Sequence, residues 1–191
     1  MANALGSGGE RKPLMDIIED KTKMRKQKGF SLIELLIVVA IILIIAAIAI
    51  PNLLRARIAA NESSAAASVR TLATSNLAYQ NAYQAYSPNL AALGPGASTG
   101  CPSGGPTSAA ACIIDFTLAS ASTATAAKSG YFFNVSSPAT LQYLITAQPA
   151  SAGSSGVKGF CATEDNVVRF NNPYAAIPDE PTCLGLATIG N

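Results

Sequence analysis

The chain has 191 residues, of which 49% are hydrophobic and only 13% are charged, and its formal net charge is +2. This length favours a single anchored domain, and so few charges argue against nucleic-acid binding, which needs a clustered basic face. The sequence contains no His, so a Ser, Thr or Cys nucleophile would lack its usual base, and we expect no enzyme, no catalytic residue and no cofactor.

Basic residues gather before a long apolar run. Residues 1–28 hold seven Lys and Arg against four acids, and Arg25, Lys26 and Lys28 directly precede the run. By the positive-inside rule, these three side chains mark the cytoplasmic flank of a membrane segment. A secretory signal peptide is the competing interpretation, but its apolar core spans only about 7–15 residues. The run here is longer, and we expect it to stay on the mature protein.

The apolar run is the main feature of the sequence. Every side chain from Leu35 to Ile50 is apolar, and the run extends back to Phe30, broken only by one Ser and one acid, Glu34. Because a helix needs about 20 apolar residues to cross a bilayer, we predict a membrane helix over residues 30–51. A carboxylate in such a helix costs roughly 2.5–3.5 kcal/mol and suggests a function. The alternative is that Glu34 lies near the membrane edge and reaches into water.

Residues Gly29-Phe30-Ser31-Leu32-Ile33-Glu34-Leu35 resemble the processing site of type IV prepilins. The resemblance is close over residues 24 to about 58 and covers the remainder only in general layout. It implies that a prepilin peptidase cleaves between Gly29 and Phe30, and that the same enzyme methylates the new N-terminus at Phe30. It also implies that Glu34 is kept for assembly.

The resemblance divides the chain into segments. Residues 1–29 are expected to be a leader that is removed, and excluded from the fold. Met24 alone would start a leader of the family's usual length, so residues 1–23 are expected to be untranslated, the alternative being a long leader. The remaining segments are a transmembrane and assembly helix, an amphipathic continuation of it, and a globular β-rich head (30–51, 52–87 and 88–191).

Pro51 ends the apolar run. In a helix interior, proline removes a hydrogen bond and kinks the axis, so we predict a kink there. The resemblance implies that the helix locally melts near Pro51 in a filament. Many family members carry a second helix breaker where this chain has Leu43, which leaves the extent of melting open.

The pattern beyond Pro51 predicts that the helix continues to about Tyr86. Residues at alternating spacings of four and three form one stripe that contains Ile58, Glu62, Ala65, Val69, Leu72, Asn76, Tyr79, Tyr83 and Tyr86. The three tyrosines are expected to anchor the head on the helix, the alternative being an aromatic ladder for electron transfer.

Short β-rich runs follow the helix. Strands are predicted over residues 112–118, 131–136, 141–147, 159–163 and 167–170, with a hairpin turn at Glu164-Asp165-Asn166 between the last two. The predicted fold is therefore α+β, with a small antiparallel C-terminal sheet packed on the second half of the long helix.

Four cysteines lie downstream of the apolar run, which suits an oxidising compartment outside the cytoplasm. They allow three pairings, and we favour Cys101 with Cys112 and Cys161 with Cys183 because these bridges close the shorter loops. A metal site is disfavoured, since the spacings match no zinc motif.

The resemblance predicts a pilus subunit that passes from the bacterial inner membrane into an extracellular filament. Its partners would be identical subunits, the prepilin peptidase, the inner-membrane assembly machinery and, before assembly, membrane lipid. A pseudopilin of a type II secretion system is the alternative, and a calcium site there would use acids such as Glu164, Asp165, Asp179 and Glu180. A signal-anchored periplasmic binding protein is the alternative from another class, but it would not explain Glu34.

Overall fold

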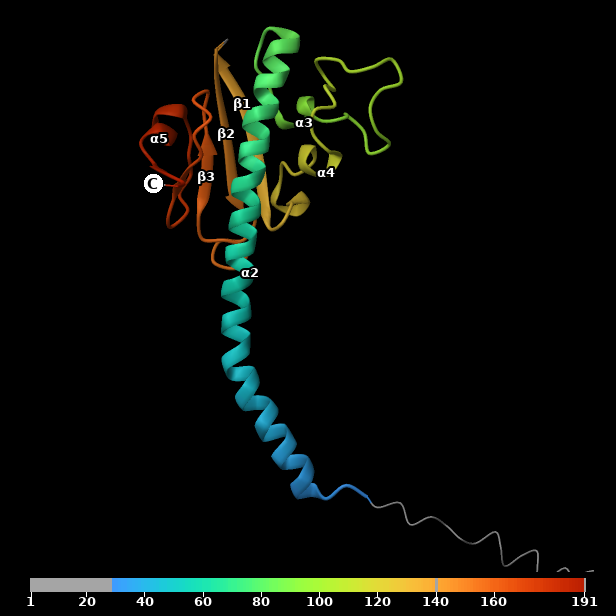
Figure 1. The fold of residues 1–191 in the computed structure, drawn as a ribbon, viewed down its shortest axis with the longest axis vertical. Helices are drawn as coiled ribbons and strands as arrows, with labels where there is room; N and C mark the ends of the chain where they lie inside the picture. The colour runs from blue at the N-terminus through green and yellow to red at the C-terminus, as the bar shows by residue number, and fades with distance from the viewer. Residues whose placement is uncertain (1–28, 140, 191) are drawn as a thin grey trace, which may run out of the picture. The chain divides into compact units, whose positions relative to one another are not determined.

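A computed structural model describes residues 29–139 and 141–190. The contacts divide the chain into two compact units, one ending at Ala46 and the other beginning at Ala47. The elements, labelled where there is room in Figure 1, are α2 (Leu32–Tyr83), α3 (Leu90–Leu93), α4 (Phe116–Ala119), the 3-10 helix η1 (Ala124–Ala126), β1 (Tyr131–Ala139), β2 (Gln142–Pro149), β3 (Gly159–Ala162), β4 (Arg169–Asn171), α5 (Glu180–Leu184) and β5 (Ala187–Thr188). A long helix followed by an antiparallel sheet confirms the predicted α+β fold.

The helix α2 ends at Tyr83, three residues before the predicted end. Gln84 adopts a φ of 58°, in the left-handed region, which stops the helix. Tyr86 lies beyond the helix but still packs on the head, with its ring centroid 4.8 Å from that of Tyr143. The predicted stripe of residues therefore extends beyond the end of α2, since its last member, Tyr86, lies after the helix.

The five strands form one antiparallel sheet in the order β1-β2-β3-β4-β5. The predicted turn Glu164-Asp165-Asn166 lies between β3 and β4. Asn166 has a φ of 58° there, and its N–H donates to the carbonyl of Thr163 at 2.9 Å. Strands that follow one another in the chain are therefore neighbours in the sheet.

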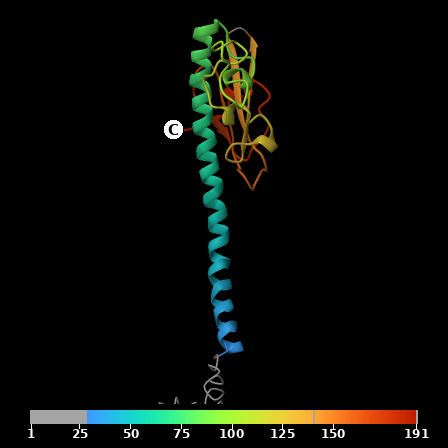
Figure 2. The ribbon, with the colours of Figure 1, turned by 90° about the vertical axis from the view of Figure 1, so that its right-hand side faces the viewer.

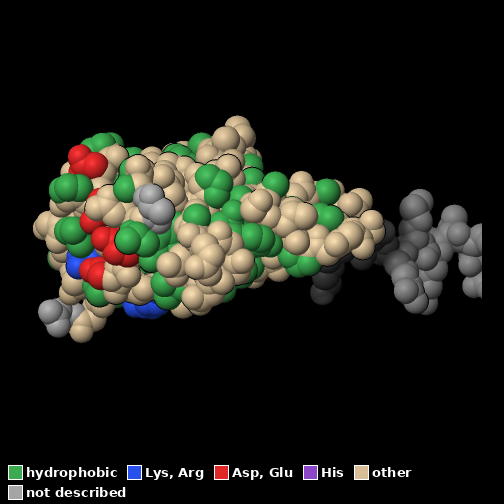
Figure 3. Space-filling model, turned by 90° about the horizontal axis from the view of Figure 1, so that it is seen from above, with side chains coloured by type: hydrophobic (Ala, Val, Ile, Leu, Met, Phe, Trp, Pro, Cys, Tyr) green, Lys and Arg blue, Asp and Glu red, His purple; other side chains and the backbone are tan. Residues whose placement is uncertain are grey.

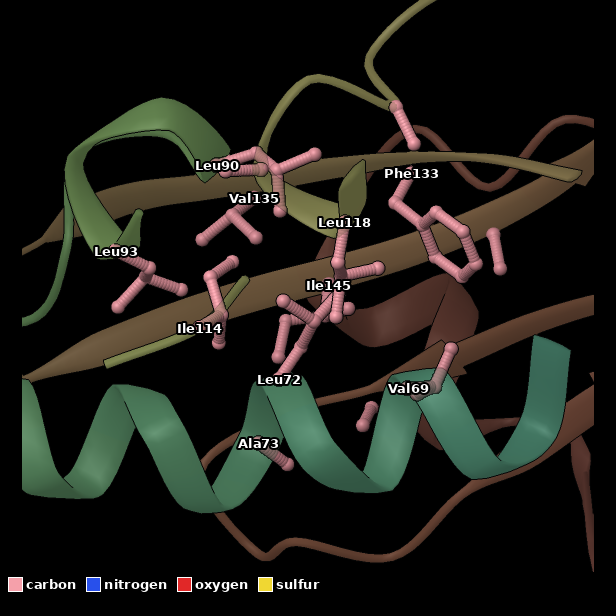
Figure 4. Packing of buried hydrophobic residues seen from close by; sticks show 14 of the residues in the cluster. Val69, Leu72, Ala73, Leu90, Leu93, Ile114, Leu118, Phe133, Val135 and Ile145 are labelled. Carbon is pink, nitrogen blue, oxygen red and sulfur yellow. The ribbon is translucent and has the colours of Figure 1, made fainter. Parts of the chain in front are cut away.

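One face of the sheet packs against the second half of α2, and Figure 2 shows the two layers side by side. Alternate β1 residues, from Tyr131 through Phe133 to Val135, are buried. In Figure 4, Val69 and Leu72 of α2 point toward the residues of the sheet and the short helices. Each large apolar side chain buried in this way contributes about 1.5–3 kcal/mol, so this cluster is the main support of the head.

The other face of β2 and β3 is covered by the C-terminal segment. Leu144 and Cys161 form a second buried cluster with Ile177 and Cys183. As a result, the middle of β2, from Tyr143 to Ala147, is buried on both faces.

The prediction of a strand over residues 112–118 is wrong. Cys112 has a left-handed φ of 56°, and the N–H groups of the next two residues both donate to the carbonyl of Leu93 rather than to a strand. Asp115 then caps α4, accepting the N–H of Leu118 at 3.2 Å. The segment has a strand-like composition because Ile114 is buried and Ile113 partly buried in the core, but it forms no ladder with another strand.

Candidate processing and assembly site

The residues of the predicted cleavage site lie directly before α2. Gly29, Phe30 and Ser31 have no regular secondary structure, and Phe30 is 80% exposed. A Cβ placed on Gly29 would meet no other described atom within 4 Å. The chain's own packing therefore does not require glycine here, and a requirement for it would come from a processing enzyme. The basic residues before Gly29 and residues 1–28 of the predicted leader 1–29 lie outside the described residues.

Glu34 lies in the first turn of α2 and is exposed. The N–H of Leu35 donates to the carbonyl of Ser31 at 3.2 Å, which makes Ser31 the N-cap and places Glu34 at the third helical position. A carboxylate there is favoured by the positive end of the helix dipole. Within residues 29–139 and 141–190 it has no ion-pair partner, so it is open to a cation supplied from outside this part of the chain.

The first part of α2 exposes apolar side chains on all sides. Its large apolar residues from Leu32 to Ile50 are 47–80% exposed. The most apolar stretch of 18 residues has a mean hydropathy of 3.3, and none of it is buried. A helix that is apolar all round needs an apolar environment. Among the described helices, α2 alone is long and apolar enough to span a membrane.

Pro51 lies inside α2, which continues through it. Because proline has no N–H, the carbonyl of Ala47 loses its usual helical partner. The predicted kink and local melting stay predictions.

Polar contacts fasten α2 to the loop of the head between β2 and β3. The Asn61 amide donates to the carbonyl of Ser155 at 2.8 Å. Glu62 Oε1 accepts the N–H groups of Val157 (3.0 Å) and Lys158 (3.2 Å), while Oε2 lies 3.3 Å from Lys158 Nζ. These contacts join residues 94 to 96 positions apart, and sequence reasoning missed them because no local pattern connects such positions.

Tyrosines near the C-terminal end of α2 pack against the head. Tyr79 is buried, its ring centroid lies 4.6 Å from that of Tyr83, and its hydroxyl donates to the carbonyl of Ser108 at 2.7 Å. Burial raises the pKa of Tyr79. These contacts support the predicted role of the tyrosines as anchors of the head.

The cysteines pair as the shorter loops favour. Cys101 is bonded to Cys112 with their Cα atoms 5.9 Å apart, and Cys161 is bonded to Cys183 with their Cα atoms 6.0 Å apart. The first bridge closes an exposed Gly- and Pro-rich loop. The second fastens the C-terminal segment to β3.

Acidic side chains gather on one side of the head (Figure 3). Asp165 forms an ion pair with Arg169 at 2.6 Å. Burial alone would raise the pKa of Asp165, but the hydrogen bonds that its carboxylate accepts, chiefly from Arg169, have the larger effect and lower this pKa. The side chain and the backbone N–H of Thr182 in α5 both donate hydrogen bonds to Asp179, the N–H at 2.9 Å. These hydrogen bonds lower the pKa of Asp179. The pKa of Glu180 is raised by burial and by its contact with Glu164. No three acidic, Cys or His side chains of the described residues are placed to hold a metal ion.

Two comparisons with known proteins bear on these residues. A family model of the prokaryotic N-terminal methylation motif matches residues 24–50. The chain is also 50% identical over 70 residues to the type IV wide pilus major component PilA4 of Thermus thermophilus. The matched region is 37% of this chain, and the chain spans about half the length of that relative, 53%. Together these two findings confirm the resemblance to type IV pilins that residues 29–35 predict.

Proposed function

We propose that this chain is a structural subunit of a type IV pilus, made as a membrane-anchored precursor and polymerised with copies of itself into a surface filament. One observation carries the proposal: the methylation motif leads directly into a helix whose apolar side chains are exposed on every side. The named role of the relative as a pilus major component supports the same class of function. A structural role of this kind needs no catalytic residue.

The length of the apolar segment fits both of its proposed environments. Residues 32–50 would span about 28 Å at 1.5 Å per residue, close to the hydrocarbon thickness of about 30 Å. Lipid would cover these side chains before assembly. In a filament the same side chains would pack against those of neighbouring subunits, so that leaving the membrane does not expose them to water.

Processing would create the charge that Glu34 requires. Cleavage after Gly29 frees an amine on Phe30, and N-methylation leaves that amine protonatable. The amine of one subunit would pair with Glu34 of a neighbour and offset the cost of placing a carboxylate among apolar helices. A slip of one turn would leave both charges unpaired in this layer, which is strongly unfavourable. Glu34 would therefore set the axial register of the subunits.

The leader and segment boundaries belong to the same proposal. Residues 1–29 would be removed, 30–51 would form the anchoring helix with its kink at Pro51, 52–87 its amphipathic continuation, and 88–191 the head. If translation starts at Met24, a gene lacking codons 2–23 should give the same mature protein and the same filament yield. Loss of processing in that truncation would show that the long leader is needed.

The test of the assembly role compares two replacements of Glu34 in cells that have no other pilus subunit. Glu34→Gln removes the charge and should abolish most filaments, while cleavage at Gly29, followed by gel mobility, continues. Glu34→Asp keeps the charge and serves as the matched control, with filaments retained. Normal filaments from Glu34→Gln would contradict the proposed pairing. Filaments seen only when a secretion system is overproduced would favour a pseudopilin instead.

A further inference from the structure

A groove of about 510 Å³ lies between the second half of α2 and the last three strands of the sheet. Charged and apolar side chains line it together, and they include Glu62, Arg70, Lys158, Phe160, Phe170 and Ile189. All of them belong to the compact unit that begins at Ala47. The groove has the volume of a recognition pocket, about 300–1,000 Å³, and it contains neither the processing motif nor the assembly charge.

The charges of the groove leave one cation without a partner. Lys158 Nζ lies 3.3 Å from the Glu62 carboxylate and 5.5 Å from the centre of the Phe170 ring. Arg70 is exposed and forms no ion pair with any described residue. The groove therefore presents one uncompensated positive charge beside apolar side chains, which suits a partner that is both acidic and apolar.

The short helix α5 offers a surface of matching chemistry. Leu184 is 44% exposed, and Glu180 precedes it by four positions, which places both residues on one side of the helix. Glu180 forms no ion pair within the part of the chain that the structure describes. Burial and the neighbouring Glu164 raise the pKa of Glu180, so a cation that approached this carboxylate would offset an unfavourable environment.

The groove and α5 lie on opposite faces of the sheet. Phe160 and Cys161 are successive residues of β3, and their side chains therefore point to opposite faces. Phe160 lines the groove and belongs to the cluster that packs on α2, whereas Cys161 is bonded to Cys183 of α5. The sheet separates the two surfaces, so α5 does not fill the groove of its own chain.

We propose that α5 of one subunit docks in this groove of a second copy of the chain, with Leu184 against Phe170 and Ile189, and Glu180 beside Arg70. A helix that presents an apolar anchor and an acid to a groove is a common mode of recognition. Because the two surfaces differ, the contact repeats from copy to copy without closing a pair, which builds an extended assembly. The inference rests on the proposed assembly of identical subunits and adds a contact between their heads.

The test is photo-cross-linking in sheared filaments. Cells express the parent chain, a copy that carries the photoreactive residue p-benzoylphenylalanine in place of Leu184, and an Arg70→Glu copy. Mass spectrometry of the cross-linked dimer measures how often the probe is joined to residues 59–70 of the parent and of the Arg70→Glu copy, each relative to its amount in the filament. Arg55→Glu is the matched control, because Arg55 is exposed on α2 but does not line the groove. A probe at Leu141, which is 70% exposed and lies outside α5, is the control for position.

We expect the Leu184 probe to join residues 59–70 of a second copy, and to join the Arg70→Glu copy about tenfold less often than the parent, because the reversed charge faces Glu180. The Arg55→Glu copy should differ from the parent by less than about twofold, and the Leu141 probe should not reach these residues. Equal cross-linking of parent and Arg70→Glu copies, or links from Leu184 only to other parts of the neighbour, would overturn the docking. The same link within single chains dispersed in detergent would also overturn it. Absence of filaments from the parent would overturn the proposed function and this inference together, whereas filaments without the link would overturn the inference alone.

Discussion

Removal of the Glu62 carboxylate tests how the head is fastened to the helix. Its side chain is only 12% exposed, and one oxygen accepts two backbone N–H groups of the segment before β3 while the other pairs with Lys158. Glu62→Ala should therefore release the loop at Val157 and Lys158 from α2. Glu62→Gln keeps a neutral acceptor and should release it only in part.

The expected size follows from the number and exposure of these contacts. A hydrogen bond to a charged group contributes about 1.5–3 kcal/mol, but Val157 is 37% exposed and its N–H can turn to water. The pair with Lys158, whose side chain is 37% exposed, adds about 0.2–1 kcal/mol after solvent screening. We expect Glu62→Ala to lower the free energy of unfolding by about 2–4 kcal/mol and Lys158→Ala by about 1 kcal/mol or less.

The assay is urea unfolding of the full chain in detergent micelles, followed by the near-ultraviolet circular dichroism of the buried tyrosines. Arg70→Gln is the control, because Arg70 is an exposed charge on α2 with no ion pair in the described part of the chain. A loss for Glu62→Ala no larger than that for Arg70→Gln would refute the fastening role.

Three further perturbations probe the rest of the head. Leu72→Ala removes a fully buried side chain from the helix–sheet core and should lower the free energy of unfolding by about 2–5 kcal/mol in the same titration. Replacing Cys161 and Cys183 together by Ala opens a bridge between residues 22 positions apart; we expect a loss of about 3 kcal/mol and faster proteolysis of the C-terminal segment, and an unchanged unfolding midpoint would count against this role. Asp165→Asn should destabilise the head at neutral pH. Because the folded pKa of Asp165 lies below its unfolded value, the stabilisation is present above about pH 4 and is lost as the pH falls through the folded pKa. Thermal unfolding across this range should show the variant and the parent converge at low pH, and Arg169→Gln should behave in the same way.

The periodic spacing of apolar residues correctly predicted the long helix and the residues by which it packs on the sheet. The stripe through Val69, Leu72 and Asn76 repeats at helical spacing, and these residues are buried against the sheet. The segment after Cys112 misled because two isoleucines and a phenylalanine resemble a strand, while the capping by Asp115 starts a short helix instead. The two-residue strand β5 (Ala187–Thr188) is too short to show any periodicity.

The candidate site likewise has one part that a local sequence pattern predicts and one part that only the fold brings together. The motif around Gly29, Phe30 and Glu34 is contiguous in the chain, so the sequence alone could identify it. The contacts of Glu62 depend on a loop whose residue Val157 is 95 positions away in the chain, and the fold brings this loop to α2. Their polar residues look like an ordinary solvated surface until the fold brings them together.

The most direct measurement is mass spectrometry of the subunit from filaments sheared off the cell surface. We expect the mature chain to begin with N-methylated Phe30, without the 29 residues of the leader. A filament subunit that begins at Ala2, a cut beyond Ile50, or surface filaments that lack this chain altogether would contradict it.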